Sequence, residues 1–235
     1  MKTLKLTTRR ALFLIVLLAA SAFYPSAAEK PEESVTTIVN RSQMVYQQLQ
    51  LSSLGLSQSA YNLAVKGWEK LKSNGVVKTS ILAICDFTQS SNNKRLYIID
   101  MKEGTLLFNS LVAHGKNTGE EFARSFSNTP SSLQSSLGFY TTKTTYQGEH
   151  GLSLKLSGLE KGFNDKAEER AIVMHGANYV CDKFCQQEGR LGRSWGCPAV
   201  SYEEHEEIIN TLKDGSCLFI YYPDKKYLSA SKLVR

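Results

Sequence analysis

The sequence predicts a mainly β fold with an N-terminal helical hairpin and one late α-helix. Between Ile81 and Tyr222, short runs rich in β-branched and aromatic residues alternate with clusters of Gly, Asn, Ser and Thr, which is typical of strands and turns. Before them, apolar residues recur at 3-4 spacing over two segments, as in amphipathic helices. We therefore expect an export signal over 1–28, a helical hairpin over 29–78 and the main domain over 79–235.

The first 28 residues have the composition of an export signal. Four basic residues precede an apolar core over 11–20, and small residues lead up to Ala28. The alternative is a retained membrane anchor, but that core is shorter than the roughly 20 residues that span a bilayer. We predict cleavage after Ala28, no stable membrane span in the mature chain, and a location in the periplasm or the cell-wall compartment.

Removal of the signal changes the charge of the protein. The full chain has a formal net charge of +6, and all four charged residues before Glu29 are basic, which leaves +2. The basic character of the full chain therefore comes largely from the signal. Nucleic acid is not an expected partner, because a basic patch is the usual footprint of such binding.

Two helices are expected before the main domain. The first begins near Val35 and ends before Leu54-Gly55, and the second begins after the N-cap candidate Ser57 and ends at Asn74-Gly75. A lone hairpin cannot bury its apolar face. We expect it to be attached to the main domain.

Six strands and one helix are expected in the main domain. The segment 126–140 is long, polar and poorly periodic, which favours a surface loop near a site or a passive connection. Ser201 and Glu204 fit a capping box for the late helix, which ends at Asp214-Gly215. The predicted strands are 81–87, 95–100, 105–113, 153–156, 170–174 and 217–222.

Cys197 is the candidate nucleophile. It stands between Gly196 and Pro198 in a turn that precedes the late helix, and the amides of residues 195–197 are candidates for an oxyanion site. A thiol has an ordinary pKa of about 8.5, so it needs a basic neighbour to react at neutral pH. The alternative is a buried structural cysteine.

Four histidines are candidates for the base. His175 follows the apolar run 171–174, so we expect its ring at a rigid strand end, and it is the preferred base. His114 has a similar but weaker context, and His150 is less favoured. His205 lies among glutamates and is expected on the solvent-facing side of a helix. A structural role at a strand end is the alternative for His175.

The remaining cysteines have several possible roles. Cys181 and Cys185 form either a local disulfide, which export favours, or part of a zinc site with His175 and Cys197. We prefer the disulfide, because a metal would quench the nucleophile, and we predict no metal and no cofactor. Cys85 and Cys217 either pair with each other or stay as buried thiols.

Two motifs resemble a known family. These are His175-Gly176-Ala177-Asn178 and Arg193-Ser194-Trp195-Gly196-Cys197-Pro198-Ala199, and both resemble the catalytic domain of L,D-transpeptidases of the YkuD-like type, in the murein L,D-transpeptidase branch. The segments around His114, Phe126-Ser127-Asn128 and 135–140 are similar to that branch as well.

The resemblance implies a β-sandwich-like domain and an enzyme, a cysteine acyltransferase acting on peptidoglycan stem peptides. By this carry-over Cys197 is the nucleophile, His175 is the base and Ser194 orients them. The residues expected to bind substrate or the oxyanion are Gly176, Trp195, Gly196, Arg193, Asn128 and Tyr140. The cysteine attacks the bond between the diamino acid at stem position three and the terminal D-alanine. The thioester then passes to an amine, which gives a 3-3 cross-link, or to water. Carbapenems are expected inhibitors.

One residue departs from the wider family. A second histidine commonly lies two residues before the cysteine, and this chain has Trp195 there. Either His175 is the only general base, or Trp195 shapes a pocket for the acyl acceptor in place of a polar catalytic role. Arg193 pairs with a substrate carboxylate or makes a surface salt bridge. The alternative functions are an L,D-carboxypeptidase or cysteine peptidase acting on wall peptides, and a non-catalytic wall-binding module.

Overall fold

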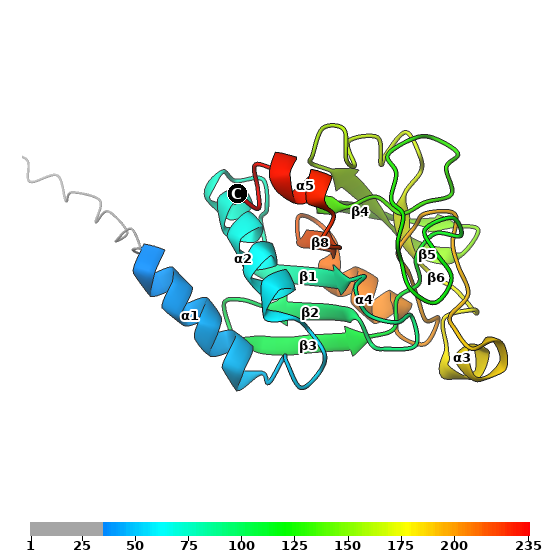
Figure 1. Cartoon of the computed structure of the whole chain (residues 1–235), viewed down its shortest axis with the longest axis horizontal. Helices are drawn as coiled ribbons and strands as arrows, with labels where there is room; N and C mark the ends of the chain where they lie inside the picture. The colour runs from blue at the N-terminus through cyan, green and yellow to red at the C-terminus, as the bar shows by residue number, and fades with distance from the viewer. Residues whose placement is uncertain (1–34) are drawn as a thin grey trace, which may run out of the picture. The chain divides into compact units, whose positions relative to one another are not determined.

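The computed structural model describes residues 35–235 of the chain. The predicted export signal over 1–28 lies outside the described residues. Within them, one sheet has the strand order β3-β2-β1-β8-β4-β5-β6-β7 (Figure 1). The strands are β1 (Ile81–Asp86), β2 (Leu96–Asp100), β3 (Thr105–Ser110), β4 (Gly138–Gly148), β5 (Gly151–Gly158), β6 (Val173–Gly176), β7 (Ala199–Val200) and β8 (Cys217–Tyr221).

The sheet nearly closes on itself. The strands β3 and β7 are its two edges, yet Ala113, just after β3, forms an antiparallel bridge with Ala199 of β7. The Ala113 N–H donates to the Ala199 carbonyl at 2.8 Å. The mainly β fold predicted from the sequence is therefore confirmed. This closure also brings the segment that contains His114 beside the Cys197 turn.

The two predicted N-terminal helices are α1 (Val35–Gln48) and α2 (Gln58–Ser73). Ser57 caps α2, because its hydroxyl accepts the Ala60 N–H at 3.2 Å. The helix α2 packs on β1 and β8. It approaches β4 closely at Gly67, where a Cβ atom would lie 2.0 Å from the Phe139 ring. A side chain at this position would push the helix off the sheet.

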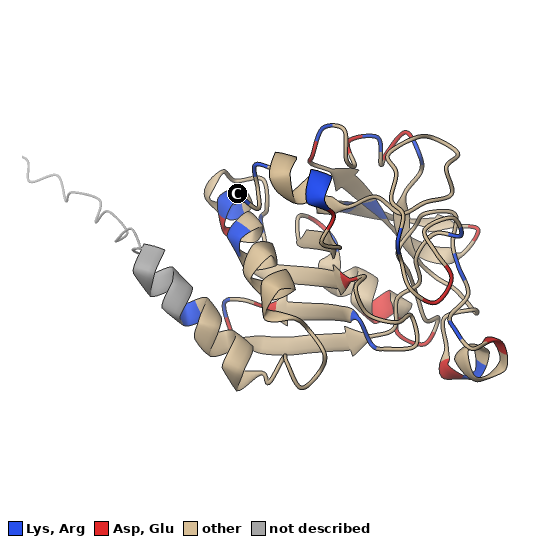
Figure 2. Ribbon diagram, viewed as in Figure 1, with Lys and Arg blue, Asp and Glu red and all other residues tan. Residues whose placement is uncertain are grey.

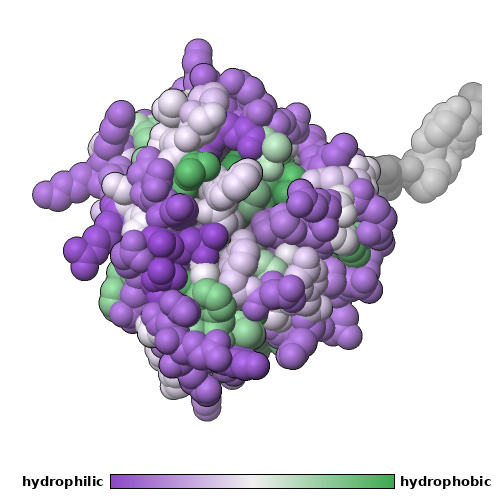
Figure 3. Space-filling view, turned by 90° about the vertical axis from the view of Figure 1, so that its right-hand side faces the viewer, coloured by the Kyte–Doolittle hydropathy of each residue, from purple (hydrophilic) through white to green (hydrophobic). Residues whose placement is uncertain are grey.

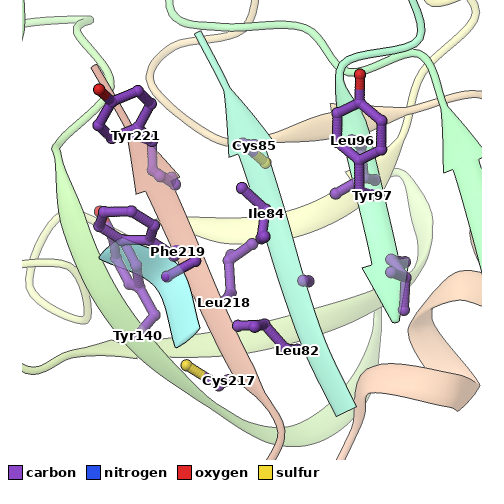
Figure 4. Close-up of a cluster of buried hydrophobic side chains, with 14 of the residues drawn as sticks. Leu82, Ile84, Cys85, Leu96, Tyr97, Tyr140, Cys217, Leu218, Phe219 and Tyr221 are labelled. Carbon is purple, nitrogen blue, oxygen red and sulfur yellow. The ribbon is translucent and has the colours of Figure 1, made fainter. Parts of the chain in front are cut away.

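The core lies between α2 and the central strands. Phe139 of β4 and Phe219 of β8 stack with ring centroids 4.1 Å apart. Leu82 and Ile84 of β1, the strand next to β8, are fully buried in the same core (Figure 4). Burying each such side chain stabilises the fold by about 1.5–3 kcal/mol. Every residue of β8 and every residue of β1 after Ile81 is buried, so both strands are covered on both faces.

The late helix is α4 (His205–Leu212), and it packs on β1, β5 and β6. The Glu204 N–H donates to the Ser201 hydroxyl at 3.3 Å, but this bond lies in the turn before the helix, and α4 has Glu204 at its N-cap with no side-chain cap, so the predicted capping box is wrong. Asp214 and Gly215 follow with φ of 65° and 108°, a turn that ends the helix. Two further helices, α3 (Asp182–Glu188) and α5 (Lys225–Ala230), were not expected. Each has fewer than eight residues, too few for a clear apolar periodicity.

The strand β4 is the largest departure from the predicted elements. The sequence predicts a loop over its first residues and no strand over the rest. Residues 138–142 are buried without alternation, while residues 143–148 are mostly exposed, and an irregularity in the pairing with β5 lies between Thr142 and Thr145. A strand with a fully buried half and a largely exposed half has no single period of two, which explains the omission. The strand β6 also begins later than expected, because the turns before it extend to residue 171.

Surface charge is mixed in sign along the described chain (Figure 2). The face in Figure 3 is mostly hydrophilic, with small separate apolar patches. Among residues 35–235, no helix is both long enough and apolar enough to cross a bilayer.

Candidate active site

The turn that carries Cys197 is held by Ser194. The Ser194 hydroxyl donates to the Cys197 carbonyl at 2.6 Å and accepts the Gly196 N–H at 3.1 Å. Gly196 has a φ of 127°, and a Cβ atom there would lie 2.7 Å from the Gln134 carbonyl oxygen. Ser194 therefore shapes the turn, and only glycine fits next to the cysteine.

Two neighbouring segments hold the turn from outside. The Ser194 carbonyl accepts the Lys116 N–H at 2.7 Å, and the Ser194 N–H donates to the His114 carbonyl at 3.0 Å. From the other side, the Ser135 hydroxyl donates to the Gly196 carbonyl at 3.2 Å. The part of the predicted loop 126–140 that precedes β4 thus lies directly against the turn that carries Cys197.

The Cys197 thiol is partly buried against the residues that lead into β6. Its Sγ atom lies 3.5 Å from the Val173 N–H and 3.7 Å from the Ala171 carbonyl oxygen. Burial raises the pKa of the Cys197 thiol above its ordinary value, while the Val173 N–H and the nearby Arg170 oppose that rise. The resting group at neutral pH is therefore a thiol, which needs a base to become a nucleophile.

His175 lies in β6 and is 5% exposed. Its Nδ1 atom is 2.9 Å from the Gly176 carbonyl oxygen. A carbonyl only accepts, so Nδ1 carries the proton and Nε2 keeps its lone pair. Burial lowers the pKa of His175, and nearby His150 and His205 lower it further. The ring is therefore neutral at pH 7 and can accept a proton.

The strands β6 and β7 bring His175 and the cysteine turn together. They pair in parallel, with His175 opposite Ala199, two residues after Cys197. Among the described residues, the hydrogen bonds of Cys197 are those to Ala171 and Val173, and none joins it to His175. Catalytic hydrogen bonds are often long without substrate and tighten when it binds.

The amides of the turn differ in availability. The Gly196 N–H donates to Ser194, as described above. Across residues 35–235, the N–H groups of Trp195 and Cys197 donate to no protein acceptor. Two of the three amides expected at an oxyanion site can thus still donate to a substrate oxygen.

His114 occupies a different environment from His175. Its Nδ1 lies 2.8 Å from a guanidinium nitrogen of Arg95, and its Nε2 lies 3.2 Å from the Gly119 carbonyl oxygen. Burial and the charge of Arg95 lower the pKa of His114 to about 4. Both ring nitrogens have protein partners, so His114 has no free lone pair for the thiol.

His205 is buried, contrary to the expected solvent-facing position. It is 7% exposed, and its Nδ1 lies 2.8 Å from the Tyr202 carbonyl oxygen. His205, Ile208, Ile209 and Leu212 follow 3-4 spacing and form the buried face of α4. The glutamates on either side of His205 favour a solvent-facing position in the sequence, whereas the 3-4 spacing identifies His205 as part of the buried face. His150, from the turn between β4 and β5, stacks on His175 with centroids 4.5 Å apart.

Gly176 and Arg193 have clear structural contacts. A Cβ atom at Gly176 would lie 2.6 Å from the Tyr202 ring, so glycine lets the start of α4 approach β6. Arg193 makes an ion pair of 2.6 Å with Glu120 and also donates to the Gly119 carbonyl at 3.2 Å. Its charge is thus engaged within the protein, which is the salt-bridge alternative raised by the sequence.

The other predicted substrate residues differ in exposure. Trp195 is 78% exposed beside the nucleophile candidate. Tyr140 is fully buried, and its hydroxyl donates to the Ser136 carbonyl at 2.9 Å. Asn128 donates to Asp165 at 2.8 Å and borders a cavity of about 410 Å³. Of these three residues, Trp195 and Asn128 are accessible to a substrate in this structure.

Arg170 belongs to the site although the sequence analysis counted it only as the first residue of a strand. One of its guanidinium nitrogens donates to the Gln134 carbonyl at 2.6 Å and lies 3.2 Å from where a Gly196 Cβ would be. Its position immediately before the apolar run that ends in His175 is the one sequence signal that could have identified it.

All five cysteines are free thiols in the structure. The predicted disulfide between Cys181 and Cys185 is therefore wrong for this state of the protein. Cys85 pairs in register with Ile220, three residues beyond Cys217, which rules out a bond between those two cysteines (Figure 4). Among the described residues, no three His, Cys, Asp or Glu side chains form a group that could hold a metal ion.

The chain resembles several solved structures. The chain spans 59% of the first solved structure it resembles, an L,D-transpeptidase from Mycobacterium smegmatis, which covers 61% of this chain at 11% identity and a TM-score of 0.38. The helical cell shape determining protein Pgp2 from Campylobacter jejuni covers 72% of this chain, with 62% of its own length, 16% identity and a TM-score of 0.38.

No curated protein matches the chain. The family model of the L,D-transpeptidase catalytic domain, however, matches residues 52–221, which include the whole site from His114 to the late helix. The chain therefore belongs to the L,D-transpeptidase catalytic domain family.

Proposed function

We propose that this protein is an exported peptidoglycan L,D-transpeptidase with Cys197 as its nucleophile and His175 as its base. The observation that carries the proposal is the neutral ring of His175, with Nε2 free, on the strand beside the Cys197 turn. Membership of the family supports the reaction class. The proposed substrate is a peptidoglycan stem peptide, and no cofactor takes part.

The first half of the reaction forms a thioester. The Sγ proton of Cys197 passes to Nε2 of His175 as sulfur bonds to the carbonyl carbon of stem residue three. The carbonyl oxygen becomes an oxyanion, for which the N–H groups of Trp195 and Cys197 are the proposed donors. The bond to the terminal D-alanine then breaks, and the imidazolium of His175 gives its proton to the leaving amine.

The second half resolves the thioester. An acceptor amine attacks the thioester carbon and gives its proton to His175, and the Cys197 sulfur leaves and is protonated again. When the amine belongs to another stem, the product is a 3-3 cross-link. When water takes its place, the product is a tripeptide stem and the protein acts as an L,D-carboxypeptidase. The exposed ring of Trp195 is proposed to border the acceptor.

Carbapenem acylation tests the nucleophile. The wild-type chain from residue 29 onward, incubated with a carbapenem, should gain one adduct by intact mass, and Cys197→Ala should gain none. Cys181→Ala is the matched control, because that cysteine also carries a free thiol, and it should acylate like the wild type. Absence of a one-to-one adduct in the wild type would favour a non-catalytic wall-binding module.

Product analysis separates transfer from hydrolysis. Disaccharide-tetrapeptide fragments should give dimers with loss of D-alanine, resolved by liquid chromatography and mass spectrometry. Tripeptide fragments alone would contradict transpeptidation and support the carboxypeptidase. Detection of the mature protein, cut after Ala28, in the periplasmic or wall fraction tests export. A product that keeps residues 1–28 would support a retained anchor.

A further inference from the structure

Arg170 holds the loop that flanks the cysteine turn. One terminal nitrogen of its guanidinium donates to the Ser127 carbonyl at 2.8 Å and to the Ser136 hydroxyl. The other donates to the Gln134 carbonyl at 2.6 Å and to the Ser132 hydroxyl at 3.3 Å. These four acceptors come from one ten-residue segment, so a single side chain fixes the path of the loop.

All four acceptors are neutral. Among residues 35–235, no carboxylate forms a salt bridge with Arg170. Its half-buried positive charge is therefore not neutralised by an ion pair. By contrast, Arg190 and Arg193 both pair with Glu120. A guanidinium whose hydrogen-bond acceptors are all neutral keeps its full positive charge, and this charge can stabilise a negative charge that forms nearby.

Two groups that can become anions act electrostatically on Arg170, the buried Tyr140 hydroxyl and the Cys197 thiol, and the thiol is the one at the proposed reaction centre. The Arg170 nitrogen that binds Gln134 lies 3.2 Å from the position of a Gly196 Cβ. The thiol itself contacts the carbonyl of Ala171 and the N–H of Val173, one and three residues after Arg170. Ala171 has a φ of 51°, a strained conformation that turns the chain at this point.

We propose that Arg170 is a positioning residue of the site, whose guanidinium fixes the 127–136 loop against the Cys197 turn and stabilises the Cys197 thiolate as it forms. This inference deepens the proposed function and rests on it for its role in turnover. The pKa of Cys197 supports it, because burial raises that pKa while Val173 and Arg170 lower it. His175 is neutral at rest, so it supplies no positive charge before proton transfer.

The test measures Cys197 reactivity without relying on turnover. Alkylation by iodoacetamide is followed against pH, and each cysteine is quantified by peptide mass spectrometry. Arg170→Gln keeps a hydrogen-bond donor and removes the charge. Arg170→Lys keeps the charge and loses most of the hydrogen bonds. Arg190→Gln is the matched control, and the Cys181 rate is the internal reference in each sample.

Arg170→Gln should raise the apparent pKa of Cys197 by about one unit and slow its alkylation at pH 7 about tenfold, as expected for loss of a nearby opposite charge. Arg170→Lys should stay within about threefold of the wild type in this readout, and Arg190→Gln should match the wild type. An unchanged profile in Arg170→Gln, or equal shifts in the Gln and Lys variants, would overturn the proposal and leave Arg170 a structural role.

Unfolding would be visible in the same experiment. Cys85 and Cys217 are fully buried, so their alkylation reports loss of the fold. If Arg170→Gln unfolds, Arg170→Lys decides: a Cys197 profile like the wild type supports the proposal, and a raised apparent pKa contradicts it. If fragments give no products while the alkylation shift is present, the proposed function fails and the effect of Arg170 on the thiol stands.

Discussion

His114 and His175 have similar local sequences, but the hydrogen-bond partners of their ring nitrogens differ. Each follows a short apolar run, precedes a glycine and is almost fully buried. His114 has a partner at each ring nitrogen, Arg95 at one and the Gly119 carbonyl at the other. Within residues 35–235, the one hydrogen-bond partner of the His175 ring is the Gly176 carbonyl, and the ring stacks on that of His150. The two histidines therefore differ in whether one ring nitrogen stays free, rather than in burial or sequence context, and this difference is why we propose His175 and not His114 as the base.

The largest expected difference is in acylation. His175→Gln should slow carbapenem acylation of Cys197 about a thousandfold, because general base catalysis contributes about 10²–10⁴-fold. His114→Gln should slow it less than tenfold. Both rates are measured by time-resolved intact mass at pH 7. Equal losses in the two variants would contradict the assignment of His175 as the base.

The second difference is in stability. Arg95 is fully buried, donates to the carbonyls of Val112 and Gln89 and contacts His114. Arg95→Met should lower the free energy of unfolding by about 3 kcal/mol, since each buried polar group left without a partner costs about 1–3 kcal/mol. The measurement is urea denaturation. Arg190→Met, which removes a more exposed arginine, should lower the free energy of unfolding far less. A loss as large as that of Arg95→Met would contradict a special structural role for Arg95.

The third difference is in the pH dependence of stability. The pKa of His114 is about 4 in the folded protein, and an unfolded histidine has a pKa of about 6.5. Between these values the unfolded state binds more protons, so stability falls as pH drops from 6.5 to 4. We expect His114 to account for about 2–3 kcal/mol of that fall. Denaturation at both pH values should show a smaller fall in His114→Gln, and an unchanged fall would contradict a neutral, buried His114.

The smallest expected effect concerns the residues that lead into each histidine. Ala171 has a φ of 51°, whereas Ala113 makes a regular bridge to Ala199. Ala171→Gly should raise stability by up to about 1 kcal/mol, because the left-handed conformation costs an L-residue about 1–2 kcal/mol and glycine loses part of this gain in entropy. Ala113→Gly should lower stability by about 0.5–1 kcal/mol. Thermal unfolding measures both, and changes of the same sign would contradict the strain at Ala171.

Local patterns were enough for much of the fold. The runs at β1, β2 and β8, the capped start of α2 and the turn at Asp214-Gly215 each carry their signal within a few residues. The strand β4 carries no such local signal, because its first half is buried and its second half is mostly exposed. The short helices α3 and α5 are shorter than the window over which a helical period becomes visible.

The sequence by itself determined the mainly β class, the L,D-transpeptidase motifs and the choice of Cys197 and His175 as the pair to test. Turn residues, apolar runs and motif spacing are local, so one chain is enough to read them. Only the tertiary structure decided which histidine keeps a free nitrogen, that Ser194 shapes the turn, and that Arg170 lies beside Cys197. The approach of Arg170 to Gly196 and the contact of Arg95 with His114 join residues far apart in the chain, so they exist only in the folded sheet. The Ser194 contact is short-range, but distant segments at 114–116 and 135 hold the turn in which it forms.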